Sequence, residues 1–101
     1  MGMFVGVGLL RIMIHQSSSL KAKRQVVKSI LGKVRSKFDV SIAEVDDQDK
    51  WQVCSMGVAV VSNDSGHVHK MLETISGYIE NLHLAEVTGF SIEIIPLGQF
   101  H

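Results

Sequence analysis

The stretch Met3–His15, which reads MFVGVGLLRIMIH, decides how this chain folds. It is apolar on both faces of an extended strand, a pattern typical of a strand in the interior of a sheet. Gly6 and Gly8 alternate in phase with Leu10 and Ile12, so all four lie on one face. Glycines on the core face of a strand let another element pack closely, and the simplest such element is a helix. The sequence therefore predicts a central strand with a helix against its glycine face.

Five further elements follow from hydrophobic periodicity and from turn residues. Ser17, Ser18 and Ser19 offer N-caps for a first helix, and Asn63–Gly66 forms a loop that ends in the N-cap of a second one. The predicted elements are a helix at about Ser19–Lys37, a short strand at Val40–Val45, a long strand at Trp51–Val61, a helix whose apolar face spans Val68–Leu82, and a strand at Val87–Ile95 that Pro96 ends.

The order of these elements is β-α-β-β-α-β, which predicts the ferredoxin-like α+β fold, a four-stranded antiparallel sheet with two helices on one face. Residues 1–101 are expected to form a single domain, because no linker, repeat or low-complexity stretch divides them. We expect the first and third strands to be central and parallel to each other. The start of the first helix and the turn Asp46–Lys50 should then lie at one end of the sheet, with Asn63 and Asp64 at the other.

Composition excludes several classes of protein. The 101 residues include ten basic and ten acidic side chains, so no strong net charge marks a general polyanion binder. Cys54 is the single cysteine, which excludes an intramolecular disulfide and the C-x-x-C zinc and redox patterns. The apolar run Met3–Leu10 is too short for a membrane span or a signal peptide. We therefore expect a cytoplasmic protein with no membrane partner.

The basic residues are concentrated in the first part of the sequence. Residues 1–37 hold eight basic and no acidic side chains, whereas residues 38–101 hold two basic and ten acidic ones. On the predicted first helix, at about 100° per residue, four cations share a stripe about 60° wide, namely Lys21, Arg24, Lys28 and Arg35. Cations in the first turns oppose the helix dipole, and each such placement costs roughly 0.2–1 kcal/mol. A helix selected for stability alone would not carry them.

Besides contact with a protein partner, two interpretations of this basic helix stay open. In the first, the Ser-capped helix start and its cations bind phosphate groups of RNA or of a nucleotide. The expected nucleic-acid-binding residues are then Lys21, Lys23, Arg24, Lys28 and Arg35. In the second, acidic residues at the same end of the fold neutralise the cations within the molecule. These acidic residues are Glu44, Asp46, Asp47 and Asp49.

No catalytic, cofactor or metal site is expected. The acidic turn Asp46–Asp49 lacks the alternating acids and the glycine of an EF-hand loop. His67 and His69 are two residues apart on a helix, so they point in nearly opposite directions and cannot share a metal. Cys54 on a central strand is expected to be an inert core thiol. Without a base, nucleophile or metal set, the sequence predicts a protein that is not an enzyme.

The face of the sheet away from the helices is the second candidate surface. The apolar side chains expected there are Val5, Val7, Leu9 and Met13. An open apolar face of this kind indicates self-association or a partner. The middle of both central strands carries no aromatic residue, so bases are not expected to stack there as they do on an RNA-recognition motif. On the same face we expect Arg11 and Glu93 to pair across adjacent strands.

Four stretches of the chain together resemble one known family. They are Phe4-Val5-Gly6-Val7, Ser19–Arg24 (SLKAKR), Ala43–Gln52 (AEVDDQDKWQ) and Val61–Asp64 (VSND). The chain is identified by them as a member of the YlxP-like family of small bacterial proteins, over nearly its whole length. Asp46-Asp47 stands where many relatives have a Gly-Asp pair, a departure that affects only the turn.

The resemblance implies a ferredoxin-like fold, in agreement with the pattern of elements. The family has no assigned function and no active site to transfer. Its genes often lie beside those of translation initiation, transcription elongation and ribosome-binding factors, so the resemblance implies a link to RNA or the ribosome by association. We expect a non-enzymatic accessory protein that contacts RNA or a ribonucleoprotein through the basic helix. The alternative is a homo-oligomeric scaffold or small-ligand sensor built on the open sheet face.

Overall fold

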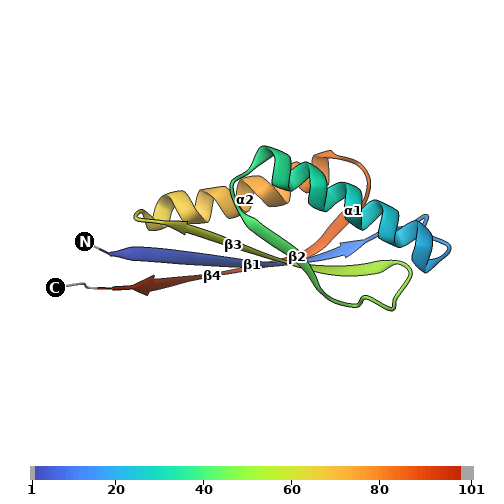
Figure 1. The fold of residues 1–101 in the computed structure, drawn as a ribbon, viewed down its shortest axis with the longest axis horizontal. Helices are drawn as coiled ribbons and strands as arrows, with labels where there is room; N and C mark the ends of the chain where they lie inside the picture. The colour runs from blue at the N-terminus through green and yellow to red at the C-terminus, as the bar shows by residue number, and fades with distance from the viewer. Residues whose placement is uncertain (1, 99–101) are drawn as a thin grey trace.

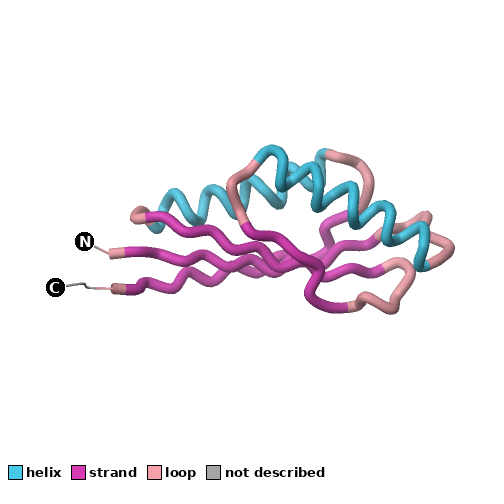
Figure 2. Tube along the Cα trace, viewed as in Figure 1, coloured by secondary structure: helices cyan, strands magenta, loops and turns pink. Residues whose placement is uncertain are grey.

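The chain folds into six elements in the predicted order, seen in a computed structural model that describes residues 2–98 (Figure 1). They are β1 (Met3–Met13), α1 (Leu20–Lys37), β2 (Ser41–Asp46), β3 (Val53–Ser62), α2 (Ser65–Asn81) and β4 (Glu86–Leu97). The strands form one sheet in the order β2-β3-β1-β4, and every neighbouring pair is antiparallel. Both helices cover the same face of the sheet (Figure 2). This arrangement is the predicted ferredoxin-like α+β fold.

The core lies between the sheet and the two helices. The even-numbered residues of β1 face it, and Leu10 and Ile12 are fully buried there. Gly6 also faces the core, where a Cβ atom would lie only 2.0 Å from Cγ1 of Val68 in α2. The missing side chain therefore lets α2 lie close against β1, as the glycine pattern predicted.

α1 begins at a predicted cap, whereas α2 begins at Ser65, inside the loop that was predicted to run to Gly66. The Ser19 hydroxyl accepts a hydrogen bond from the Ala22 N–H at 3.0 Å and starts α1. The Asp64 carboxylate accepts the N–H groups of Gly66 and His67 and starts α2. Each cap satisfies backbone donors that have no partner inside the helix.

The prediction that the first and third strands are parallel is wrong. β1 and β3 are central and adjacent, but they run antiparallel, with Phe4 opposite Ser62 and Met13 opposite Val53. Each βαβ crossover keeps the strand direction, so β1 matches β2 and β3 matches β4. The turn between β2 and β3 then reverses the second pair relative to the first. All neighbours in the sheet are therefore antiparallel.

The prediction that Pro96 ends the last strand is also wrong. β4 continues through Pro96 to Leu97, and Pro96 lies opposite Phe4. β4 is an edge strand that pairs with β1 alone, so one side of it has no neighbour that needs an N–H donor. Proline is tolerated in such a position, whereas it would interrupt a central strand.

The expected pair of Arg11 and Glu93 does not form. Both side chains are exposed on the open face, as predicted. The register, however, places Arg11 opposite Gly89 and Glu93 opposite Val7. Alternation along a strand determines the face of each residue but not its partner, because the partner depends on the register of the strands.

The two ends of the sheet carry the expected loops (Figure 1). The start of α1 and the β2–β3 turn lie at one end, and the loop before α2 lies at the other end, near the N-terminus. Gln52 binds the two loops of the first end together, because its side-chain amide donates to the carbonyl oxygens of His15 and Ser17, both at 3.3 Å. The backbone carbonyl oxygen of Gln52 accepts a hydrogen bond from the backbone N–H of Ile14 at 2.8 Å.

Candidate nucleic-acid interface

The basic stripe of α1 lies on the outer side of the helix, next to the edge strand β2. Lys21, Arg24 and Lys28 are exposed there, and Arg35 is exposed on the same line. The Arg35 guanidinium donates to the carbonyl oxygen of Ile42 in β2 at 2.7 Å, which holds this end of the stripe against the sheet. Of the five residues expected to bind nucleic acid, these four form one exposed surface, which we call the α1 stripe.

Lys23 is the exception: it was expected on this surface, and the structure shows that it is buried instead. Its side chain is 1 % exposed. The Nζ atom donates to the carbonyl oxygen of Asp47 and lies 3.1 Å from Oε2 of Glu44. At about 100° per residue, Lys23 lies on the face of α1 that Val27 and Ile30 bury, so it points under the helix and away from any phosphate outside.

The two interpretations of the basic helix therefore apply to different residues. Neutralisation within the molecule holds for Lys23, which pairs with the Glu44 carboxylate, while the acidic turn contributes only the backbone carbonyl oxygen of Asp47. It does not hold for Lys21, Arg24 and Lys28, which form no ion pair with any residue in 2–98. The first turn of α1 also contains no acidic residue that would offset the helix dipole. These three cations of the α1 stripe are therefore available to interact with solvent or with a partner.

Asp47 forms a charged cluster that sequence reasoning missed. Its backbone is left-handed, with φ at 65°, a conformation that Asp tolerates better than most residues. The buried carboxylate accepts the Ser55 hydroxyl at 2.8 Å, lies 3.0 Å from Nζ of Lys50, and is 3.9 Å from the Arg11 guanidinium. The hydrogen bond from Ser55 is the largest cause that lowers the pKa of Asp47, followed by that with Lys50. Because these three groups already contact the carboxylate, its role is to stabilise the β2–β3 turn.

Cys54 has the character of a core residue. It is fully buried on β3. Burial is the largest cause that raises the pKa of its thiol, and together with the nearby Glu44 carboxylate it raises that pKa to about 12. The reactive form of a cysteine is the thiolate. At neutral pH the Cys54 side chain is therefore a thiol with little nucleophilic character.

The open sheet face is apolar and accessible. The side chains of Val5, Val7 and Met13 are half-buried, and Leu9 is 51 % exposed. Three further apolar residues of the same face are exposed on the neighbouring strands, namely Val61, Ile95 and Leu97. Because neighbours in the register share a face, these side chains continue the patch that the sequence predicted on β1 alone.

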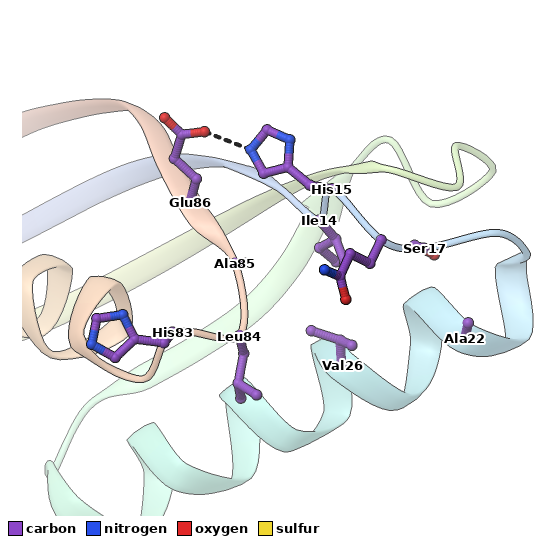
Figure 3. Close-up of a pocket in the computed structure, with 10 residues that line it drawn as sticks. Ile14, His15, Ser17, Ala22, Val26, His83, Leu84, Ala85 and Glu86 are labelled. Carbon is purple, nitrogen blue, oxygen red and sulfur yellow. Dashed lines mark hydrogen bonds and ion pairs between the residues drawn. The ribbon is translucent and has the colours of Figure 1, made fainter.

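A groove of about 560 Å³ opens beside the start of α1, between the β1–α1 and α2–β4 loops (Figure 3). Ala22 and Val26 of α1 form one wall, and Leu84 lies on the other side. His15 and Glu86 close the rim, with His15 Nε2 at 2.6 Å from Glu86 Oε1. Periodicity gave no signal for this groove, because its two walls come from segments about 60 residues apart.

Within residues 2–98, neither helix is long and apolar enough to span a membrane. The same part of the chain contains no group of three or more histidine, cysteine or acidic side chains placed to hold a metal ion.

Comparisons with known proteins agree with the resemblance to the YlxP-like family. The profile described as "Protein of unknown function (DUF503)" matches residues 5–92. The chain is 38 % identical over 84 residues to the uncharacterized protein YlxP of Bacillus subtilis (strain 168), which covers 83 % of this chain and 91 % of that protein. Among solved structures, the de novo designed protein Foldit4 has a TM-score of 0.48 and 17 % identity, over 97 % of this chain and 99 % of that one. The chain belongs to the DUF503 family, the YlxP-like proteins of unknown function.

Proposed function

We propose that this protein is a non-enzymatic accessory module that contacts RNA or a ribonucleoprotein through the α1 stripe. One observation carries the proposal. Lys21, Arg24 and Lys28 lie side by side without an ion pair to any residue in 2–98, and Lys21 and Arg24 also oppose the dipole at the start of the helix. Such an arrangement lowers stability, and a polyanion at this surface would offset that cost.

The chemistry of the stripe favours contact with phosphate groups. Lys and Arg donate to phosphate oxygens, and such contacts carry no sequence information. The four stripe residues are cations without an aromatic side chain among them, so base stacking adds nothing to the contact. Binding should therefore be independent of sequence and should weaken with salt. Three or four contacts correspond to a slope of log K against log salt of about −2 to −3.

The experiment compares two triple variants of equal charge. Lys21→Gln, Arg24→Gln and Lys28→Gln together remove the exposed cations of the stripe. Lys33→Gln, Lys37→Gln and Lys70→Gln together remove three exposed cations from elsewhere on the two helices. Each protein is titrated with structured and unstructured RNA at low and moderate salt. We expect the first triple variant to lose binding to all RNAs by about tenfold or more, and the second to lose much less.

Absence of binding by the unmodified protein at low salt, or an equal loss in both triple variants, would contradict the proposal. A loss confined to one RNA sequence would also contradict it, because phosphate contacts are shared by all sequences.

The open sheet face favours a second candidate function, that of a homo-oligomeric scaffold. The observation behind it is the exposure of large apolar side chains on three neighbouring strands, including Val61 at 63 %. Isolated apolar residues are normal on a protein surface, whereas a contiguous patch indicates an interface.

A further inference from the structure

The centre of the open sheet face is Leu9, with small residues on both sides. Leu9 lies opposite Gly57 of β3 and Ser91 of β4. The Val45 side chain lies over Gly57, where a Cβ atom would be 3.1 Å from Val45 Cγ1. Leu9 therefore projects above Ser91 on one side and lies beside the exposed Val45 side chain on the other, at the apolar centre of the face.

Two opposite charges lie at equal distances from this centre. Arg11 is two residues further along β1 and faces Gly89. Glu93 faces Val7, two residues back along β1. At about 3.4 Å per residue, each charge is about 7 Å from the Leu9 row, measured along the strands in opposite directions.

We propose that this face packs against the same face of a second copy of the chain, about a two-fold axis that lies between the copies along the Leu9 row. This rotation places the Arg11–Gly89 row of one copy over the Val7–Glu93 row of the other. Each strand then lies over the same strand of the second copy. Glu93 of the second copy then lies over Gly89, which has no side chain to exclude it and is next to Arg11. The symmetry repeats the contact, so one arrangement forms two ion pairs around a Leu9–Leu9 contact.

Both charged residues are free to make this contact. The Arg11 side chain is 58 % exposed, and its distance of 3.9 Å to Asp47 is at the long end of ion-pair distances. A guanidinium has five N–H donors, so it can hold Asp47 and a second carboxylate together. Glu93 is exposed and forms no ion pair with any other residue of the described chain.

The face is also large enough for a specific dimer. β1 has 11 residues, and four strands lie side by side. Because β2 has only 6 residues, standard strand spacings then give a face of roughly 600 Å². Specific interfaces bury about 600–1,000 Å² on each partner, so this face reaches the lower end of that range. The self-complementary position of the two charges selects a second copy over an unrelated protein, since only a copy supplies both at once.

The test measures dimerisation by sedimentation velocity over a range of protein concentrations. Glu93→Arg should weaken the dimer about tenfold or more, because it places two arginines against each other at both contacts. Arg11→Glu should weaken it for the same reason. The double variant Arg11→Glu with Glu93→Arg restores both ion pairs with their signs exchanged, so it should recover most of the affinity. Glu73→Arg, on the exposed surface of α2, is the matched control and should change nothing.

Leu9→Asp provides a second test, which leaves the ion pair between Arg11 and Asp47 unchanged. Thermal unfolding of each variant establishes that it is folded. A protein that stays monomeric up to about 0.1 mM would overturn the proposal. A dimer that Glu93→Arg and Leu9→Asp both leave intact would do the same and would point to another interface, such as the β4 edge. The proposal is independent of the RNA function, because its readout is mass and its variants lie on the other face of the sheet.

Discussion

At the scale of single residues, Lys23 shows that one cation of a basic helix can belong to the core. It occupies a position on the buried face of α1 that would ordinarily hold an apolar side chain. The aliphatic stem packs under the helix, and the ammonium group reaches the Asp47 carbonyl oxygen and the Glu44 carboxylate. Lys23 thereby connects α1 to β2 and to the β2–β3 turn. Its role is to hold this end of the fold together.

Replacement of Lys23 should therefore destabilise the protein much more than replacement of an exposed lysine. Lys23→Met removes the partner of a mostly buried Glu44 carboxylate, and we expect a loss of about 3 kcal/mol in the free energy of unfolding by urea. Lys28→Met on the exposed α1 stripe should change it by less than about 0.5 kcal/mol. Lys23→Met combined with Glu44→Gln should recover part of the loss, since no unpaired charge is left behind. Equal losses in the two single variants would show that the buried contacts contribute nothing.

At the scale of elements, the glycines show how the helices are placed on the sheet. Gly6 is in direct contact with α2, because the nearest atom to its missing Cβ position is Cγ1 of Val68. Gly32 lies within α1, and a Cβ atom there would meet nothing within 4 Å. Both positions are glycine, but packing requires a glycine only at Gly6.

The same substitution at these two glycines should have opposite effects. Gly6→Ala forces α2 away from β1, and we expect a loss of about 1–3 kcal/mol in the free energy of unfolding. Gly32→Ala places a better helix former in open space and should add about 0.5–1 kcal/mol. Urea unfolding of the two variants beside the unmodified protein measures both effects. A destabilised Gly32→Ala, or a Gly6→Ala of unchanged stability, would contradict the packing described here.

At the scale of the whole molecule, the sheet separates two surfaces of different character. Both helices lie on one face of the sheet (Figure 2), so the α1 stripe belongs to the helical layer. The apolar patch around Leu9 lies on the opposite face. The proposed RNA contact and the proposed dimer contact share no residue. Distant sites without shared partners behave additively.

We therefore expect the two activities to be separable. Leu9→Ser should weaken the dimer but leave the affinity for a short RNA, long enough for one copy only, unchanged within about twofold. The triple variant Lys21→Gln, Arg24→Gln and Lys28→Gln should lose RNA affinity and keep the dissociation constant of the dimer. Sedimentation velocity and RNA titration on the same protein preparations provide both readouts. Loss of both properties in either variant would mean that the two surfaces are coupled.

The order of elements, the cap of α1, the glycine face of β1 and the α1 stripe were predictable from the sequence, because each depends on residues close together in the chain. The position of Lys23 was not, although its helical angle next to Val27 was an available signal. A lysine in that position is stable only if Glu44 and the Asp47 carbonyl oxygen reach it from another element. No local pattern contains that information.

Pairing between strands was decided by the tertiary structure. Alternation placed Arg11 and Glu93 on the correct face, but their partners depend on the register. The register also shifts between Arg11 and Ile12 and again between Glu44 and Asp46, where bulges insert residues that a period of two cannot reveal. The second shift precedes Asp47, which the fold turns inward to Ser55. Local chemistry thus determined which segments form and which face each residue takes, and contacts between distant segments determined which residues meet.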